Sequence, residues 1–464
     1  MLLLPALLLC SLLQSQNITG RITNEFGEPL PFANVYVQQT AGGTISDDAG
    51  LYNLALATEG EYDLVFSSLG YTSKSLHAIL TGDTLRLDVK LTTSGVDLEE
   101  ITVSASKKDP AFGIIRKVID HKKAHLQAAN SYRTTVYLKA VEEVEKTKKP
   151  NAKPEVNLDA DPLDPFAAEE QAQQELLSSL NMVEMQVVLN YQYPKQYKEE
   201  RTAYKAYGRT DGLFVPRFAE TDFNFYRNMV RLTGIADAPI ISPLSNNAIL
   251  SYKYKLLSTD YEDGQLVYKI KVIPRKSGNS TCSGLLYINE GSWSINRVDL
   301  TFASGALKFF DAFSLQQSYQ EVEKDFWIIN SQTFQYETKQ GKRQTFRGST
   351  AMSYADYELN YAFPPKFFGN EVAVTTQEAY ERDTAYWQET RTISLSEEEA
   401  QMVAIRDSIE AVQSSKTYQD SIQELYNKVT LLELAFDGVG IRNNEKKTHI
   451  YIAPLASLVG YSVV

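Results

Sequence analysis

Alternation of apolar and polar side chains is the main pattern along this chain, and it predicts a mainly β protein. Between residues 17 and 105, short alternating runs are separated by turns that contain Gly, Pro and Asp; the runs are ITGRIT, ANVYVQ, LYNLAL, YDLVFSSL and LRLDVKLT. This spacing predicts a small β-sandwich. Longer alternating stretches follow between about residues 182 and 373, at 266–273, 284–289, 293–302 and 326–336. They predict an antiparallel sheet with one solvated face.

Helical periodicity is clear in two places. Asp109 and Pro110 form a helix start that precedes an apolar stripe at helical spacing, namely Ile114, Ile115, Val118 and Ile119. Near the C-terminal end, Ser396 with Glu399 forms a capping box before the apolar positions 402, 405, 409 and 412. A second apolar set occupies 418, 422, 425, 429 and 432, after a break at 414–416. We therefore expect two helical pieces that dock on their own sheet.

Three segments depart from globular patterning. Residues 1–13 read MLLLPALLLCSLL, which is too short to span a membrane and predicts a signal peptide over 1–16. Residues 155–175 carry seven acidic residues and no Lys or Arg, which predicts a flexible acidic excursion. Residues 450–464 are uncharged and have the length of one to two barrel strands, so we expect the chain to stop inside a longer protein.

Composition narrows the classes of function. The 464 residues predict about three domains, and a net charge of -12 disfavours a nucleic-acid partner. The chain has 28 Tyr and 20 Phe but only 4 His and 2 Cys, so it is poor in the residues that most metal and nucleophile chemistry requires. Removal of the signal peptide would leave Cys282 as the one cysteine, which excludes an internal disulfide and predicts a buried small side chain.

Few residues are candidates for chemistry. His121 and His125 stand four positions apart on the predicted helix, the best metal pair in the chain, but Lys122, Lys123 and the absence of a zincin Glu favour a solvated helix end. Asp47 and Asp48 fit a turn better than a calcium site. Five tyrosines could stack sugars or contact lipid, although strand packing explains them as well: Tyr191, Tyr193, Tyr197, Tyr204 and Tyr207. We assign no catalytic, cofactor-binding or metal-binding residue.

The N-terminal motifs resemble a known family. In order they are 20–23 with Gly27, Pro29-Leu30-Pro31, Ala33-Asn34-Val35, 46–52 and 67–71. This set resembles the carboxypeptidase regulatory-like domain. The resemblance implies a transthyretin-like seven-strand β-sandwich without catalytic residues.

The middle of the chain resembles a second family. The stretch YKIKVIPRKSGNSTCSGLLYINEGSWSINRVDLTF, with residues 224–228 and 241–244, resembles an uncharacterised family of envelope proteins from the Bacteroidota. In that family, a regulatory-like sandwich and a conserved middle region precede an outer-membrane β-barrel. A looser likeness to periplasmic lipoprotein carriers would imply a curved sheet that holds acyl chains.

These observations predict a mainly β chain with minor α content and six segments. The segments are a signal peptide (1–16), the sandwich (17–105), a helix, strand and acidic excursion (106–180), an antiparallel curved-sheet α+β region (181–395), helices (396–443) and the start of a truncated barrel (444–464). We expect a non-enzymatic envelope protein, exported to the outer membrane with periplasmic N-terminal domains. Expected partners are outer-membrane or periplasmic proteins and the membrane, and a glycan or lipid is a candidate ligand. The alternatives are a lipid or lipoprotein carrier and a zinc-dependent hydrolase.

Overall fold

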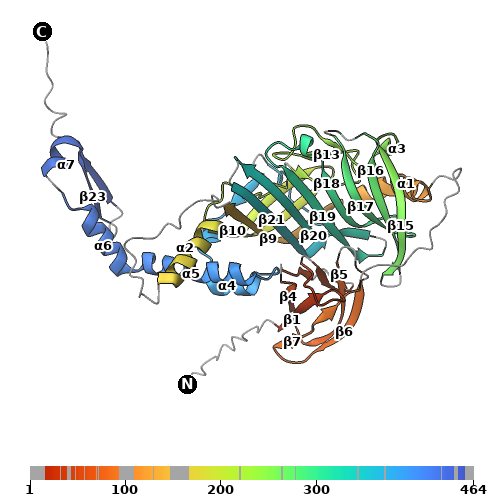
Figure 1. Cartoon of the computed structure of the whole chain (residues 1–464), viewed down its shortest axis with the longest axis horizontal. Coiled ribbons are helices and arrows are strands. Elements are labelled where there is room, and N and C mark those ends of the chain that lie inside the picture. Colours follow the sequence, from red (N-terminus) through yellow and green to blue (C-terminus); the bar gives the residue numbers. More distant parts are fainter. Residues whose placement is uncertain are drawn as a thin grey trace, which may run out of the picture. The chain divides into compact units, whose positions relative to one another are not determined.

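The computed structural model describes residues 16–454, apart from 32, 39–42, 48, 57, 69–70, 72, 93–108, 129, 147–166, 219–220, 263–264, 277, 279, 325, 342–343, 370–371, 430 and 444–447. The expected signal peptide therefore lies almost wholly outside the described residues. The chain divides into two compact units, Met1–Glu399 and Ala400–Val464, which are described separately. The predicted mainly β composition is confirmed (Figure 1).

The N-terminal part of the first unit is a pair of small β-sheets. One has the order β4-β1-β7 with β8 also paired to β1, and the other has the order β3-β2-β5-β6. The strands are β1 (Gln16–Thr23), β2 (Asn34–Val37), β3 (Gly43–Ile45), β4 (Leu51–Leu56), β5 (Gly60–Ser67), β6 (Lys74–Leu80), β7 (Thr84–Arg86) and β8 (Val89–Lys90). Strands β7 and β8 pair in parallel with successive parts of β1, so they form one interrupted strand. A shared apolar core, including Ile18, Val35 and Phe66, packs between the sheets.

The rest of the first unit is built on an open eleven-stranded sheet. Its order is β15-β16-β17-β18-β19-β20-β21-β9-β10-β11-β22. The strands are β9 (Ser131–Lys146), β10 (Leu180–Gln192), β11 (Gln196–Tyr207), β15 (Tyr252–Glu262), β16 (Gln265–Pro274), β17 (Cys282–Asn289), β18 (Ile295–Phe302), β19 (Ala312–Glu323), β20 (Phe326–Gln340), β21 (Gln344–Leu359) and β22 (Ala373–Thr375). Only the pairing of β11 with β22 is parallel. The four alternating stretches predicted between 266 and 336 all fall on strands of this sheet.

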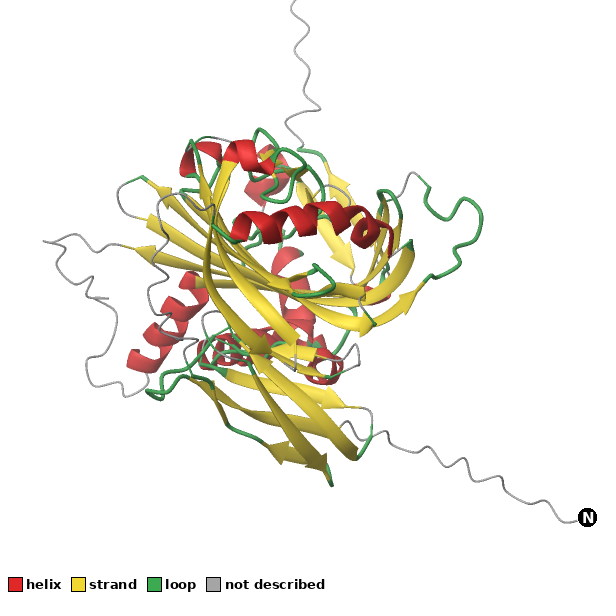
Figure 2. Cartoon of the chain, turned by 90° about the vertical axis from the view of Figure 1, so that its right-hand side faces the viewer, coloured by secondary structure: helices red, strands yellow, loops and turns green. Residues whose placement is uncertain are grey.

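The two faces of this sheet differ in what covers them. We call the face that bears Leu138, Leu300 and Phe334 the inner face, and the face that bears Lys139 and Glu184 the outer face. Helix α1 (Ala111–Ala128) packs on the inner face through its buried apolar side chains. Figure 2 shows a helix lying along the sheet.

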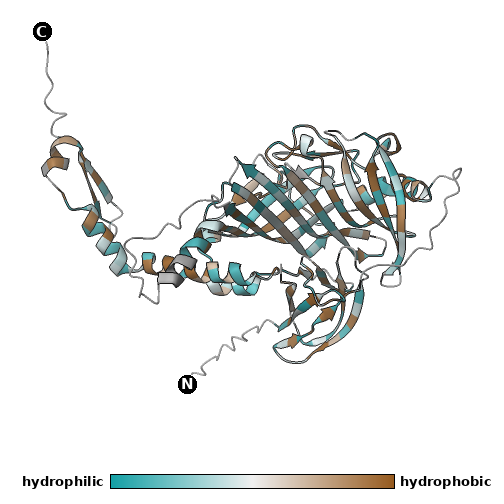
Figure 3. Ribbon diagram, in the orientation of Figure 1, coloured by the Kyte–Doolittle hydropathy of each residue, from teal (hydrophilic) through white to brown (hydrophobic). Residues whose placement is uncertain are grey.

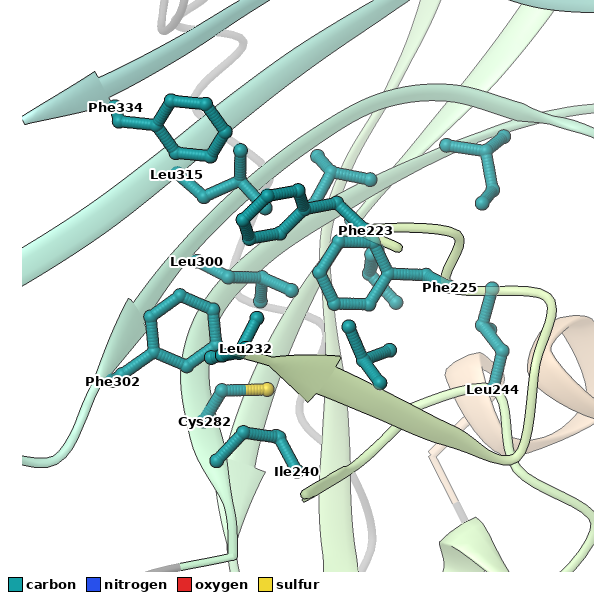
Figure 4. Close-up of a cluster of buried hydrophobic side chains, with 14 of the residues drawn as sticks. Phe223, Phe225, Leu232, Ile240, Leu244, Cys282, Leu300, Phe302, Leu315 and Phe334 are labelled. Atoms are coloured by element: carbon teal, nitrogen blue, oxygen red, sulfur yellow. The ribbon is translucent and has the colours of Figure 1, made fainter. Parts of the chain in front are cut away.

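A loop region closes the inner face beside α1. It contains β12 (Thr221–Asp222), β13 (Met229–Leu232), β14 (Ile240–Ile241) and α3 (Ala248–Ser251). Figure 4 shows Phe223 and Phe225 of this region among Leu300, Leu315 and Phe334 of the sheet. The main core of the protein therefore lies between the inner face and this cover.

Local sequence signals account for most helix ends. The Asp109 carboxylate accepts a hydrogen bond from the Ala111 backbone N–H at 2.9 Å, as the predicted start of α1 requires. Helix α2 (Ala167–Ser179) corrects the expectation of a flexible acidic excursion over 155–175, because it includes part of that stretch. The segment AAEEQAQQELL is rich in strong helix formers, which explains the difference. Among the described helices, none is both long and apolar enough to cross a membrane.

The strap that ends the first unit begins with η2 (Glu378–Tyr380) and α4 (Thr384–Thr390) and leads into α5 (Glu397–Ser414). The capping box is confirmed: the Glu399 N–H donates to Ser396 Oγ at 3.2 Å, and the Ser396 N–H donates to Glu399 Oε2 at 2.9 Å. A further short helix, η1 (Ser304–Ala306), follows β18.

The second unit contains the rest of α5, two short helices and a hairpin. They are α6 (Lys416–Tyr426), α7 (Leu431–Phe436), β23 (Val439–Asn443) and β24 (Thr448–Ile452). Ser415 caps α6 at the predicted break, and α6 buries none of its residues within this unit, so the expected docking of its stripe on the sheet stays a prediction. Strand β23 lies within the segment 396–443 that was expected to be helical, and it pairs with β24. Figure 3 shows hydrophobic residues on this unit.

Candidate functional site

A small aromatic cavity lies on the inner face. Tyr132 of β9, Tyr191 of β10 and Tyr197 of β11 form a row in which neighbouring ring centroids are 4.9 Å apart. This row comes from cross-strand pairing, because Tyr191 lies opposite both Tyr132 and Tyr197. The cavity beside it has a volume of about 140 Å³ and is closed by Phe223 and Tyr226 of the covering loops.

Two glutamines and a tyrosine of this cavity hydrogen-bond to one another, whereas the buried Nε1 of Trp327 has no partner among the described residues. Gln317 Nε2 donates to Gln332 Oε1 at 2.6 Å and to the Phe223 carbonyl at 3.1 Å. The Tyr319 hydroxyl donates to Gln317 Oε1 at 3.1 Å. Both glutamines are only 4% exposed, so this network fixes the floor of the cavity rather than leaving groups for catalysis.

The volume of the cavity limits its ligand. A cavity of about 150 Å³ holds roughly one benzene ring, and this one measures about 140 Å³. An acyl chain of a lipoprotein is several times larger. The cavity as folded therefore suits one small ring and not an acyl chain.

His125 is not the solvated residue that the sequence indicated. Its ring stacks on Tyr226 with centroids 5.0 Å apart, and its Nε2 lies 3.1 Å from the Ser292 carbonyl oxygen. Burial lowers the pKa of His125, and the Ser292 carbonyl opposes this change. His121, one turn earlier, is exposed, with Nδ1 2.7 Å from the Lys117 carbonyl oxygen. The two imidazoles thus have different surroundings and partners.

Lys122 is also buried rather than solvated. Its ammonium donates to Asn228 Oδ1 at 2.6 Å and to the Leu244 carbonyl at 3.0 Å, and desolvation lowers its pKa. Lys122 therefore fastens α1 to the covering loops. Within the described part of the chain, no group of three or more His, Cys, Asp or Glu side chains could hold a metal ion.

The other candidate residues have structural environments. Asp47 Oδ1 accepts hydrogen bonds from the N–H groups of Ala49 and Leu51 at 2.9 and 2.8 Å, which is the predicted turn, while Asp48 lies outside the described residues. Cys282 is buried, as predicted, and burial raises the pKa of its thiol to about 12. A thiol of this kind is a poor nucleophile at neutral pH.

The predicted tyrosine set does not form one surface. Only Tyr191 and Tyr197 line the cavity. Tyr204 contacts Tyr380, with ring centroids 5.4 Å apart, and Tyr207 is buried, with its hydroxyl accepting from Arg391 at 3.4 Å. Tyr193 is 36% exposed in the turn after β10. The structure thus divides the set between two faces of the sheet.

A clasp of buried charges occupies the outer face. Arg391 donates to both carboxylate oxygens of Glu184, at 2.6 and 2.7 Å, and the Tyr137 hydroxyl donates to Glu184 at 2.5 Å. Lys139, which lies opposite Glu184 on the neighbouring strand, donates to Glu399 at 2.7 Å and to the Ser394 carbonyl at 2.8 Å. We call these residues, together with residues 384–399 of the strap, the clasp.

The same strap reaches the sandwich. Ile393 forms a parallel bridge with Ile45 of β3, and both pack with Trp387 in one buried cluster. Asn34 of β2 also accepts hydrogen bonds from Ser318 Oγ, at 3.1 Å, and from Ser331 Oγ. The sandwich, the large sheet and the strap are therefore packed into one body.

Sequence reasoning missed the clasp. Glu184 and Arg391 are separated by 207 positions. Alternation along β10 places Glu184 on the face opposite Met185, but nothing local identifies its partner. Only the tertiary fold brings these groups together.

We expect acid to destabilise the wild type more than a His125→Gln variant. The unfolded chain has a His pKa near 6.5, and burial lowers the folded value, so the unfolded state binds the proton first as pH falls. The stability that neutral His125 provides is complete above the unfolded pKa and is lost below it. Melting temperatures at about pH 7.5 and about pH 5 test this. The control is His121→Gln, at the exposed histidine. If acid lowered the melting temperature of His125→Gln as much as that of His121→Gln, the burial of neutral His125 would not explain the acid sensitivity.

The fold thus defines a two-module β protein, in which a pair of small sheets and a large, mainly antiparallel sheet are joined by a strap. The chain belongs to the Family of unknown function (DUF5686), whose family model matches residues 114–357. A CarboxypepD_reg-like domain matches residues 18–103, which confirms the N-terminal resemblance.

Individual relatives are more distant. The chain is 34% identical over 119 residues to TonB-dependent receptor P3 of Formosa agariphila, an alignment that covers 25% of this chain and 11% of that protein. It therefore spans about a tenth of the length of that receptor. A LolA superfamily protein from Nitrosomonas europaea is 12% identical, with 55% of this chain and 97% of that chain covered and a TM-score of 0.23. A DUF1329 family protein from Desulfovibrio piger is 11% identical, with 57% and 98% covered and a TM-score of 0.22.

Proposed function

We propose that this chain is a non-enzymatic cell-envelope protein whose two β modules form one periplasmic scaffold of an outer-membrane protein and bind partner proteins there. The observation that carries the proposal is the clasp. Among the ion pairs of the described residues, the two in the clasp have the least exposed side chains. Lys139 and Glu399 are 6% and 4% exposed, and Arg391 and Glu184 are 13% and 0% exposed. The two pairs fix the strap to the large sheet, and the same strap contacts the sandwich through Ile393 and Ile45. A fixed arrangement of two modules is what a scaffold needs.

Two further features support the proposal. The apolar leader at residues 1–13 supports export, and the partial likeness to a TonB-dependent receptor supports an envelope role. The outer face also keeps an open groove of about 550 Å³, lined by polar side chains such as Gln335 and Arg347 and by apolar ones such as Val141 and Phe313. Protein–protein interfaces have this mixed polar and apolar character.

Photo-cross-linking in cells tests the proposal. A cross-linking amino acid at Gln335, in the groove, should give discrete products with envelope proteins in an outer-membrane fraction. The same amino acid at Ile79, which is 54% exposed on the sandwich, is the matched control and should give few. A chain that fractionates with the cytosol, or that gives no product at Gln335, would contradict the proposal.

The carrier is the second candidate, because the inner face does hold an aromatic cavity. Its volume of about 140 Å³ counts against acyl chains. Mass spectrometry of lipids that copurify with the chain separates the two functions, since a stoichiometric acyl lipid would favour the carrier. Stoichiometric zinc that is lost in a His121→Ala, His125→Ala variant would favour the hydrolase instead.

A further inference from the structure

A second cavity lies where the sandwich meets the outer face of the sheet. Its volume is about 240 Å³, and its lining comes from β2 and β5 of the sandwich and from β16 to β20 of the sheet. Ligand sites occur preferentially where two modules meet. This cavity shares Tyr319 and Trp327 with the aromatic cavity, but its other lining residues differ, and it shares none with the open groove.

The lining is dominated by uncharged hydrogen-bonding groups. Four amide side chains contribute to it: Gln38, Gln265, Asn289 and Asn296. The two asparagines are held in place, because Asn296 Nδ2 donates to Asn289 Oδ1 at 3.0 Å and Asn289 Nδ2 donates to Ser294 Oγ at 2.9 Å. Asn289 is 0% and Asn296 is 9% exposed, so this side of the cavity is preorganised.

The charged groups of the cavity are balanced. Arg297 is 6% exposed and lies over the Tyr287 ring, with the guanidinium carbon 4.6 Å from the centroid. Glu321 lines the same cavity and is exposed. One guanidinium and one carboxylate give no net preference for an anion or a cation. The lining therefore favours a neutral ligand that both donates and accepts hydrogen bonds.

Aromatic rings complete the lining. Tyr36 comes from the sandwich, and Tyr319 and Trp327 come from the sheet. Such rings offer apolar faces to the C–H groups of a ligand while amides bind its hydroxyls. The volume of about 240 Å³ exceeds the ~150 Å³ that holds benzene and falls below the ~300–1,000 Å³ of pockets for larger ligands. It fits one ring that carries several hydroxyl groups.

We propose that this cavity binds a single neutral sugar residue, a hexose or an N-acetylhexosamine, between the sandwich and the sheet. Amides from both modules hydrogen-bond the hydroxyls, and the aromatic side chains contact the face of the ring. Binding then requires both modules in their clasped arrangement. The alternative is a cavity that holds only water, and the experiment below distinguishes it from a cavity that binds sugar. The sugar site is independent of the proposed scaffold role.

Saturation-transfer NMR on the full chain tests this site. The probes are glucose, galactose, mannose and N-acetylglucosamine, each at about 10 mM, well above the ~1 mM dissociation constant expected for one small ring. At least one should receive saturation from the protein. Glucuronate is added as a charged probe, and tighter binding of glucuronate than of every neutral sugar would overturn the neutral assignment.

Variants on both sides of the cavity localise the binding. Gln38→Leu on the sandwich and Gln265→Leu on the sheet should each weaken the bound sugar at least tenfold, and neither residue lines the aromatic cavity. Gln340→Leu, at the exposed end of β20 and outside the lining of this cavity, is the control and should bind as the wild type does. Circular dichroism identifies a variant that fails to fold. In that case, sugar binding by the other variant decides whether the sugar binds in this cavity. No transfer to any neutral sugar, or full binding by both folded variants, would show a water-filled cavity and would leave the scaffold proposal standing.

Discussion

Replacing Arg391 with Met is expected to lower the free energy of unfolding by about 3–5 kcal/mol, because it leaves a buried carboxylate without its cation. Glu184 is 0% exposed, and Arg391 supplies the two hydrogen bonds that its carboxylate receives from a cation, at 2.6 and 2.7 Å. Urea denaturation followed by tryptophan fluorescence measures the loss. Trp293, Trp327 and Trp387 all belong to the first unit, so the signal reports on the unit that contains the clasp.

Two controls distinguish the effect of breaking the buried ion pair from the effect of removing any arginine. Arg347 makes comparable contacts to Glu145 and Glu337, at 2.7 and 3.3 Å, but its side chain is 59% exposed. Arg347→Met should leave the midpoint unchanged, since exposed pairs contribute little. A Glu184→Leu, Arg391→Met double variant should be more stable than Arg391→Met alone, because no charge is then left unpaired. Equal losses in Arg391→Met and Arg347→Met would contradict the role given to the clasp.

The sequence could predict features that depend on near neighbours. Strand alternation, the caps at Asp109 and Ser396 and the break at 414–416 involve residues at most a few positions apart, and the structure confirms them. The fold class followed from the same local patterns. The N-terminal module was identified by motifs in family order, and the domain match at 18–103 agrees.

Features that depend on distant residues could not be predicted. His125 looked solvated because its cover, Tyr226 and the Ser292 carbonyl, comes from segments about 100 and 167 positions away. The same holds for Lys122, whose partner Asn228 is 106 positions distant. Both cavities are also lined from several strands at once. Alternation shows which face a residue is on, but it does not show what packs against that face.

The stripe on α6 shows a different limit. Tyr418, Ile422 and Leu425 have helical spacing, yet they are 37%, 42% and 64% exposed. Periodicity identifies an apolar face without identifying what covers it. The corresponding stripe on α1 is buried, because α1 lies on the inner face of the sheet.

Phe334→Ala is expected to have the other large effect, a loss of about 3–5 kcal/mol. Phe334 is 0% exposed, and its ring centroid lies 4.7 Å from Phe223, 5.2 Å from Phe214 and 5.8 Å from Phe313. Its removal takes away apolar contacts and leaves a cavity that the surrounding strands cannot fill. Urea denaturation measures the loss. Phe309→Ala is the matched control, because Phe309 is 64% exposed and should change stability by less than about 0.5 kcal/mol.

The position of Phe334 makes a second result specific. It joins the sheet to Phe214 and Phe223 of the covering loops, and Phe223 also closes the aromatic cavity. In Phe334→Ala, amide hydrogens of residues 213–218 and 223–226 should therefore exchange faster at denaturant concentrations that leave β17 and β18 protected. Uniform acceleration across the whole sheet would mean that the loops and the sheet open together. In that case the loops would not be a separate cover, and the inner cavity would be as rigid as the strands that line it.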